Sequence, residues 1–190
     1  MARLNLRVLG GFQLRIDSRD VLLPAKKAQA LLTYLGLRAG RPHSRATLVG
    51  LLWANASEQR ARHSLRQTVL GLRKVFARAR NTGLVVRGDT IGLDTGAVAV
   101  DALQFRSLVR QGTSRALEAA VALYEGALLE GFDVAEDAFD EWLHAEREQL
   151  HARALQALAK LLRHQAKRGA VPEQPYIEFT FPTITDPLMK

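Results

Sequence analysis

Residues 58–80 restrict the possible folds of this chain most strongly, because they combine a helical period with seven basic residues and one acidic residue. On a wheel of about 100° per residue, the apolar residues gather on one side: Ala61, Leu65, Val69, Leu72, Val75, Phe76 and Ala79. The other side carries Arg62, Arg66, Arg73, Lys74 and Arg80. Such a helix buries one face and offers the other to a polyanion. Because an α-helix fits the major groove and Arg makes bidentate contacts, the segment predicts a DNA-reading helix.

The net charge of +8 is distributed unevenly along the chain. Residues 1–95 hold 17 Lys and Arg against 5 Asp and Glu, a balance of +12. Residues 96–190 hold 10 against 14, a balance of −4. This division indicates a basic module that binds an anion, followed by an acidic module with a different task.

The length and the absence of Cys exclude several classes of protein. A chain of 190 residues is long enough for one domain or two small ones and buries roughly 70% of its unfolded surface. Without Cys there are no disulfides and no thiolate zinc sites, which fits a reducing compartment. The first residues, MARLNLRVLGG, contain no uninterrupted apolar run typical of a signal peptide or membrane span. We therefore expect a soluble, cytoplasmic protein with no membrane partner.

Hydrophobic patterning in the first half predicts a winged helix. Apolar residues alternate over 4–8 and 12–16 around a Gly10–Gly11 turn, and a third strand is expected at 21–23. Helices are expected from Pro24 to about Arg38, with Gly40 as the stop, and over 45–53 and 58–80, where Ser44 and Ser57 are the expected caps. Residues 84–86 and 91–93 then flank a tight turn at 87–90, which predicts a terminal hairpin. Arg87-Gly88-Asp89 also spells an adhesion motif, but the hairpin explains it.

From Asp101 onward the hydrophobic period is helical. Asp101 is the expected cap of a helix that ends at Gly112, Ser114 caps a second helix through Tyr124, and a long third helix covers 140–167. Short connections and small residues resemble paired-helix repeats, although no 34-residue repeat is evident. The predicted fold class is thus α+β followed by all-α: a winged helix-turn-helix domain and a TPR-like helical domain.

The last 19 residues, 172–190, differ from the rest because they contain four of the six prolines, and a helix cannot continue through them. They could form a docked strand, a disordered tail or a segment foreign to the protein. We place the domain boundaries at 1–96 for the DNA-binding domain, 97–171 for the helical domain and 172–190 for this atypical tail.

Several stretches, in this order and spacing, resemble the SARP family of bacterial transcriptional activators, which join an OmpR-type winged helix to a bacterial transcriptional activation domain (BTAD). In the first half the resemblance rests on LRVLGGFQLRID at 6–17, on the segment 26–53 and on the Ala-Arg and Leu-Arg pairs of 61–73. In the second half it rests on VDALQF at 100–105, ALYEGALLEGF at 122–132 and EWLHAEREQL at 141–150. Together the resemblance covers about 170 of the 190 residues, and it departs from the family at the Pro-rich tail, so the BTAD is expected to be partial.

The resemblance implies that the third helix enters the major groove, that the hairpin wing touches the adjacent backbone, and that two copies bind head to tail on direct repeats near a promoter. It also implies that the turn between the second and third helices, Ala54, Asn55, Ala56 and Ser57, contacts RNA polymerase. No G-x-x-x-x-G-K motif is present, which excludes the ATPase-bearing relatives for this chain. The expected partners are double-stranded DNA, RNA polymerase and a second copy of the chain on DNA.

The candidate DNA-binding residues fall into two groups. Base contacts are expected near the start of the basic helix, with Arg62 and Arg66 reading guanine and Gln67 reading adenine. Phosphate contacts are expected further along the helix and on the hairpin. The complete set is Arg60, Arg62, His63, Arg66, Gln67, Leu70, Arg73, Lys74, Arg78, Arg87 and Thr90. The alternative to a DNA-binding helix is an Arg-rich surface helix that is simply exposed to solvent.

We find no pattern that predicts catalysis, a cofactor or a metal site. His144, Glu148 and His151 share one helix face but lack a further ligand from another element. The carboxylates of Glu136, Asp137, Asp140 and Glu141 are explained as the negative start of a long helix, and His43 has no Ser or Asp partner arranged with it. The competing functional class is a scaffold whose basic half binds RNA or another acidic partner, without an activator role.

Overall fold

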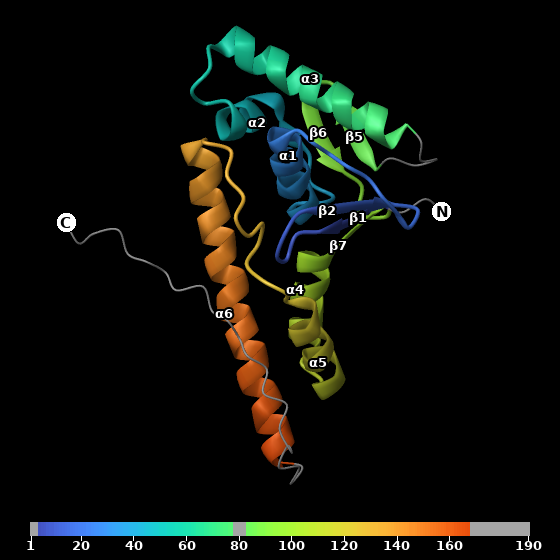
Figure 1. Ribbon diagram of the computed structural model, residues 1–190, viewed down its shortest axis with the longest axis vertical. Coiled ribbons are helices and arrows are strands. Elements are labelled where there is room, and N and C mark those ends of the chain that lie inside the picture. The colour runs from blue at the N-terminus through green and yellow to red at the C-terminus, as the bar shows by residue number, and fades with distance from the viewer. Residues whose placement is uncertain (1–3, 78–82, 168–190) are drawn as a thin grey trace, which may run out of the picture.

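The computed structural model describes residues 4–77 and 83–167, and its elements follow the predicted order of a mixed half and a helical half (Figure 1). The mixed half contains β1 (Leu4–Arg7), β2 (Gln13–Ile16), β3 (Arg19–Asp20), α1 (Lys26–Leu37), β4 (His43–Ser44), α2 (Arg45–Leu52), α3 (Glu58–Phe76), β5 (Leu84–Arg87), β6 (Thr90–Leu93) and β7 (Val98–Val100). The helical half contains α4 (Asp101–Gln111), α5 (Ser114–Leu123) and α6 (Asp137–Lys167). The predicted fold class is confirmed.

Two small sheets frame the three helices of the first half. The first has the strand order β3-β2-β1-β7, in which β1 pairs antiparallel with β2 and parallel with β7. Sequence patterning indicated no strand at β7, because a three-residue segment that pairs across more than 90 residues has no local signal. The second sheet, β4-β6-β5, contains the predicted hairpin together with the short strand before α2.

The third strand lies at Arg19–Asp20, so its prediction at 21–23 was wrong. Asp17 and Ser18 both have positive φ, 48° and 67°, which forms a two-residue turn. Pairing therefore resumes at once, with Arg19 opposite Ile16. Leu23 is instead buried in the core just before α1.

The helix caps of the first half were predicted with mixed success. The Ser44 side chain accepts a hydrogen bond from the Thr47 amide at 3.0 Å, which confirms the cap of α2. Ser57 occupies the cap position of α3, but its side chain makes no capping hydrogen bond, so that expectation was wrong. Its carbonyl instead accepts from the Ala61 amide at 2.9 Å, and the acid Glu58 provides the favourable charge in the first turn.

In the helical half, two predicted caps shift by one residue. Thr113, not Ser114, caps α5, because its side chain accepts from the Ala116 amide. Val100 is the N-cap of α4, and Asp101 is the first helical residue. The buried Asp101 carboxylate accepts from the amides of Val8 and Leu9 at 2.9 and 3.0 Å, so it ties α4 to the end of β1. Burial raises the pKa of this carboxyl, against the lowering effect of those amides.

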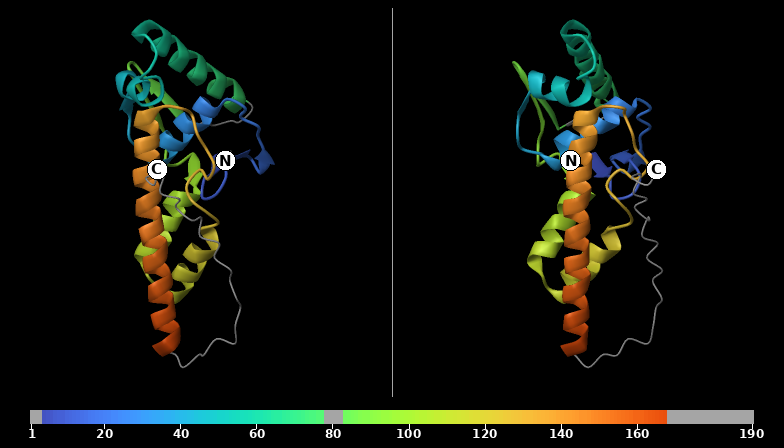
Figure 2. Two further views of the ribbon diagram at one scale, coloured as in Figure 1. Left: turned by 60° about the vertical axis from the view of Figure 1, so that its left-hand side comes forward. Right: turned by 90° about the vertical axis from the view of Figure 1, so that its left-hand side faces the viewer.

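The two halves share one hydrophobic core and a set of polar contacts between them. Leu129 donates its amide to the carbonyl of Val8 at 2.8 Å, which joins the loop after α5 to β1. Glu146 on α6 pairs with both Arg38 on α1 and Arg106 on α4. Two further views show α6 running past the mixed half and along α4 and α5 (Figure 2). The helical half therefore packs directly against the mixed half and is not merely connected to it by a linker.

Gly36 allows α1 to pack closely on the first sheet, and its replacement tests that contact. A Cβ at this position would lie 2.9 Å from Leu6 Cδ2 and 3.4 Å from Val100 Cγ2, and both neighbouring residues are buried. We expect Gly36→Val to lower the free energy of unfolding by about 1–3 kcal/mol, because the branched side chain has no space. Urea denaturation measures this change.

The matched control is Gly50→Val in α2, where an added Cβ meets nothing within 4 Å. We expect its free energy of unfolding to stay within about 0.5 kcal/mol of the wild type. Equal destabilisation by the two variants would show that close packing at Gly36 is not the cause.

Candidate nucleic-acid interface

The basic helix α3 lies at one end of the molecule, away from α4 and α5, with one side packed and the other open (Figure 1). Its buried residues are Ala61, Leu65, Val69, Leu72 and Phe76. These belong to the apolar side of the sequence-derived wheel, and they pack against α1 and α2. The packed stripe determines which side chains of α3 face outward.

Every DNA-binding candidate on the described part of α3 is exposed. These residues are Arg60, Arg62, His63, Arg66, Gln67, Leu70, Arg73 and Lys74. Leu70 is 41% exposed, an apolar side chain left open among polar ones. Arg78, expected to contact phosphate, lies outside the described residues. Exposure makes a role in DNA contact possible, but that role stays a prediction.

The outward residues of α3 divide into a crest and a flank by their spacing along the helix. His63, Gln67, Leu70 and Lys74 lie opposite the buried stripe and form the crest. Arg62, Arg66 and Arg73 follow one another at intervals of four and seven residues, which places them along one edge. We call these three residues the arginine flank.

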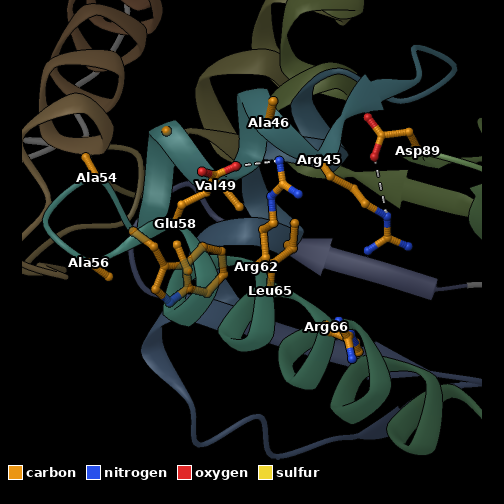
Figure 3. A pocket seen from close by; sticks show the side chains of 13 residues that line it. Arg45, Ala46, Val49, Ala54, Ala56, Glu58, Arg62, Leu65, Arg66 and Asp89 are labelled. Atoms are coloured by element: carbon orange, nitrogen blue, oxygen red, sulfur yellow. Dashed lines mark ion pairs between the residues drawn. The ribbon is translucent and has the colours of Figure 1, made fainter.

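A groove of about 770 Å³ separates the start of α3 from α2 and the β5–β6 hairpin. Arg62 and Arg66 line it from α3, Arg45 from α2 and Asp89 from the hairpin turn, as Figure 3 shows. Trp53 lines the same groove. The groove therefore brings together three guanidinium groups from two helices, a pattern suited to a phosphate chain.

Sequence reasoning missed Arg45 as a member of this site. It is the first residue of α2, directly after the Ser44 cap. Its amide donates to the Asp89 carbonyl at 2.9 Å, and its side chain lies 4.0 Å from the Asp89 carboxylate. These contacts fix the hairpin turn relative to α2.

On the described part of α3, Arg62 forms an ion pair with Glu58. Arg62 Nη2 lies 2.6 Å from Glu58 Oε1, one helical turn away, and both side chains are largely exposed. An exposed pair of this kind stabilises a helix by about 0.3–0.5 kcal/mol at most. Arg62 is therefore held by a weak contact that an anion could replace.

The hairpin residues lie at the turn between β5 and β6, where Arg87 pairs with Thr90. Arg87 is exposed, whereas Thr90 is half-buried and its hydroxyl donates to the Arg87 carbonyl at 2.9 Å. Gly88, with φ of 53°, takes the left-handed conformation in this turn. Arg87 is thus free to reach outward, while the hydroxyl proton of Thr90 is used within the turn.

Residues 54–57, the predicted polymerase-contact turn, are all exposed at the junction of α2 and α3. The turn is held from the helical half, because the Ala54 amide donates to Glu136 Oε2 at 3.1 Å. Glu136 is 4% exposed and also pairs with Lys27 Nζ at 2.6 Å. Glu136 lies at the start of the long helix, as predicted, and its side chain also reaches α1 and this turn.

Other polar residues noted in the sequence form no arrangement typical of catalysis or metal binding. His43 packs edge-on against Tyr34 at 5.1 Å between ring centroids. Burial lowers the pKa of its imidazole, and the charges of Arg38 and Arg41 lower it further. Within residues 4–77 and 83–167, no group of three or more His, Asp or Glu side chains could hold a metal ion. In the same ranges no helix is long and apolar enough to cross a membrane.

Comparison with known proteins places both halves of the chain. Residues 100–174 match the family described as Bacterial transcriptional activator domain. The fold is similar to that of Mycobacterium tuberculosis EmbR, solved in complex with a low-affinity phosphopeptide, with a TM-score of 0.76 and 22% sequence identity. The alignment covers 89% of this chain and 47% of the EmbR chain, so the chain spans about half the length of that protein. No curated protein matches it in sequence.

The structure thus combines a winged-helix half with a helical half, and residues 100–174 match the bacterial transcriptional activator domain. The domain match and the shared fold support the resemblance to SARP-type transcriptional activators. The matched domain is a regulatory family and not a class of enzymes.

Proposed function

We propose that this protein is a sequence-specific, DNA-binding transcriptional activator. The observation that carries the proposal is the exposed basic surface of α3, whose apolar stripe is fully packed while every described cation points outward. A rigidly mounted helix with this surface fits the major groove, and its position in a winged helix is the one used to read bases.

Base and phosphate contacts are divided along the length of α3, and both the arginine flank and the crest contribute to each. Arg62 and Arg66, with Gln67 and His63 beside them, face bases from the first turns of α3, together with Arg60 and Leu70. Arg73 and Lys74 contact phosphates further along the helix, and Arg78 is a predicted phosphate contact outside the described residues. Arg87, beside Thr90, approaches the adjacent DNA backbone from the hairpin. The groove that Arg45 lines receives a phosphate strand between α2 and α3.

The activator role adds two partners, a second copy of the chain and RNA polymerase, and a location to this proposal. Two copies bind as a homodimer on direct repeats near a promoter, and the turn at 54–57 contacts RNA polymerase. Both events take place in the cytoplasm. The bacterial transcriptional activator domain at 100–174 supports the activator role, since a DNA-binding scaffold alone would not require it.

A gel shift tests DNA binding and separates it from the scaffold alternative. The protein is titrated with a duplex selected from a random-sequence pool, with an unrelated duplex and with RNA of equal length, at several salt concentrations. If about five cations neutralise phosphates, log affinity falls with log salt at a slope of about −4 to −5 per monomer. Equal affinity for all three nucleic acids, or affinity indifferent to salt, would contradict the proposal.

Arg66 and Arg73 lie on the same flank of α3 but should contribute differently. We expect Arg66→Ala to reduce discrimination between selected and unrelated duplexes by about 1–3 kcal/mol, because a base contact is lost. Arg73→Ala should weaken binding to both duplexes alike and make the salt slope shallower by about 1, because only a phosphate contact is lost. Gel shifts across salt measure both effects, and Arg115→Ala on α5 is the control. Identical losses on both duplexes for Arg66→Ala would remove its assignment to a base.

Glu58→Gln tests whether Arg62 is used for DNA. Removing this carboxylate frees Arg62 from its 2.6 Å partner and removes one negative charge from the interface. We expect duplex affinity to rise, because Arg62 becomes available to the duplex and one repulsive charge is removed. Glu118→Gln on α5 removes the same charge far from the interface and should leave affinity unchanged. A matching increase in both variants would mean that only net charge matters.

The role of the turn at 54–57 is tested by a variant that should separate binding from activation. We expect Asn55→Asp to bind the selected duplex with nearly wild-type affinity, because this exposed residue is off the described face of α3. Transcription by RNA polymerase from a promoter with that duplex upstream should fall, because a charge has been added to the contact. Unchanged transcription would argue against a polymerase contact at Asn55.

A further inference from the structure

Glu136 connects three elements that are far apart in the sequence. Its backbone carbonyl accepts from the amides of Phe139 and Asp140 at 2.9 and 3.0 Å, so it begins α6. Its side chain pairs with Lys27 on α1 at 2.6 Å and accepts from the Ala54 amide at 3.1 Å. One residue of the helical half therefore reaches both α1 and the turn between α2 and α3.

The hydrogen bond from the Ala54 amide to Glu136 joins the turn at 54–57 to a residue far away in the sequence. Within the described ranges, the other hydrogen bonds of this turn are local: the Ala56 amide donates to the Trp53 carbonyl at 3.1 Å, and the Ala61 amide donates to the Ser57 carbonyl at 2.9 Å. The four side chains of the turn are small and exposed, so apolar packing holds them weakly. The carboxylate of Glu136 is consequently the contact that selects one position for the start of the turn.

Lys27 keeps this carboxylate in place. Its ammonium lies 5.5 Å from the ring centre of Trp53, the buried residue immediately before the turn. A carboxylate paired with an ammonium accepts stronger hydrogen bonds than a neutral group. Lys27, Trp53 and Glu136 thus form one cluster at the base of the turn.

We propose that Glu136 is a positioning residue through which the activation domain holds the α2–α3 turn in the conformation that contacts RNA polymerase. The inference rests on the proposed function. Through this carboxylate, any movement of the start of α6 is transmitted to the turn. The helical half therefore controls the position of the turn and is not only a second binding surface. DNA reading by α3 should persist without this contact, because the orientation of α3 is set by its buried stripe, which packs against α1 and α2.

Two variants in the whole chain test this role, with an exposed glutamate on α6 as the control. Glu136→Ala removes both contacts, and Glu136→Gln keeps an oxygen for the Ala54 amide but loses the charge. Glu141→Ala removes a carboxylate that is exposed on the same helix. Thermal unfolding of each variant establishes that it folds before the other measurements are made.

The first readout is hydrogen exchange of a peptide that contains residues 54–57. We expect Glu136→Ala to accelerate exchange about tenfold, the effect of losing one charge-assisted hydrogen bond on a local equilibrium. Glu136→Gln should accelerate it by a smaller factor, and Glu141→Ala should leave it unchanged. If Glu136→Ala does not fold, Glu136→Gln carries the test. Wild-type protection in whichever Glu136 variants fold would overturn the proposal.

The second readout compares duplex affinity with transcription by RNA polymerase from a promoter carrying the selected duplex. We expect Glu136→Ala to keep its affinity within about twofold and to lose transcription about tenfold, with partial rescue in Glu136→Gln. Parallel losses of affinity and transcription would overturn the proposal, because Glu136 would then be only a folding residue. A wild-type protein that shifts no duplex would contradict the proposed function instead, and the exchange readout would still decide whether Glu136 holds the turn.

Discussion

Packing of the α3 stripe against α1 and α2 is the interaction on which the other features depend. Leu65, Leu72 and Phe76 are almost completely buried, so the rotation of α3 about its own axis cannot change without exposing them. That rotation decides whether Arg62 and Arg66 line the groove and whether Gln67 stands on the crest. The same packing positions the hairpin, because Arg45 on α2 binds Asp89 in its turn.

Most of the candidate site could be predicted from the sequence because it lies on one helix. The period of 3.6 determines the two faces of α3 locally, so the exposed cations follow from spacing alone. Arg45 and Glu136 could not be found this way. Each acts through a partner distant in sequence, Asp89 in one case and Ala54 in the other, and no local pattern encodes those pairings.

The fold shows the same division between local and distant information. Helices α1, α2 and α4 were expected within a few residues of their observed bounds, since their stripes and stop signals are local. Strand β7 was missed because its parallel pairing with β1 depends on the path of the intervening chain. Asp101 was expected to cap a helix, but its carboxylate accepts hydrogen bonds from the amides of Val8 and Leu9, just after β1. These amides need an acceptor only in the folded protein, where the end of β1 lies beside α4, so the sequence pattern did not show it.

The uneven charge of the chain follows from how the two halves meet. Acidic residues of the helical half pair with cations of the mixed half that lie off α3: Glu125 with Arg7, Glu136 with Lys27 and Glu146 with Arg38. On the described part of α3, by contrast, Arg62 is the cation with an acidic partner, and that partner is a neighbour on the same helix. The helical half therefore neutralises three cations of the mixed half and leaves the exposed cations of the described part of α3 without an acidic partner from that half.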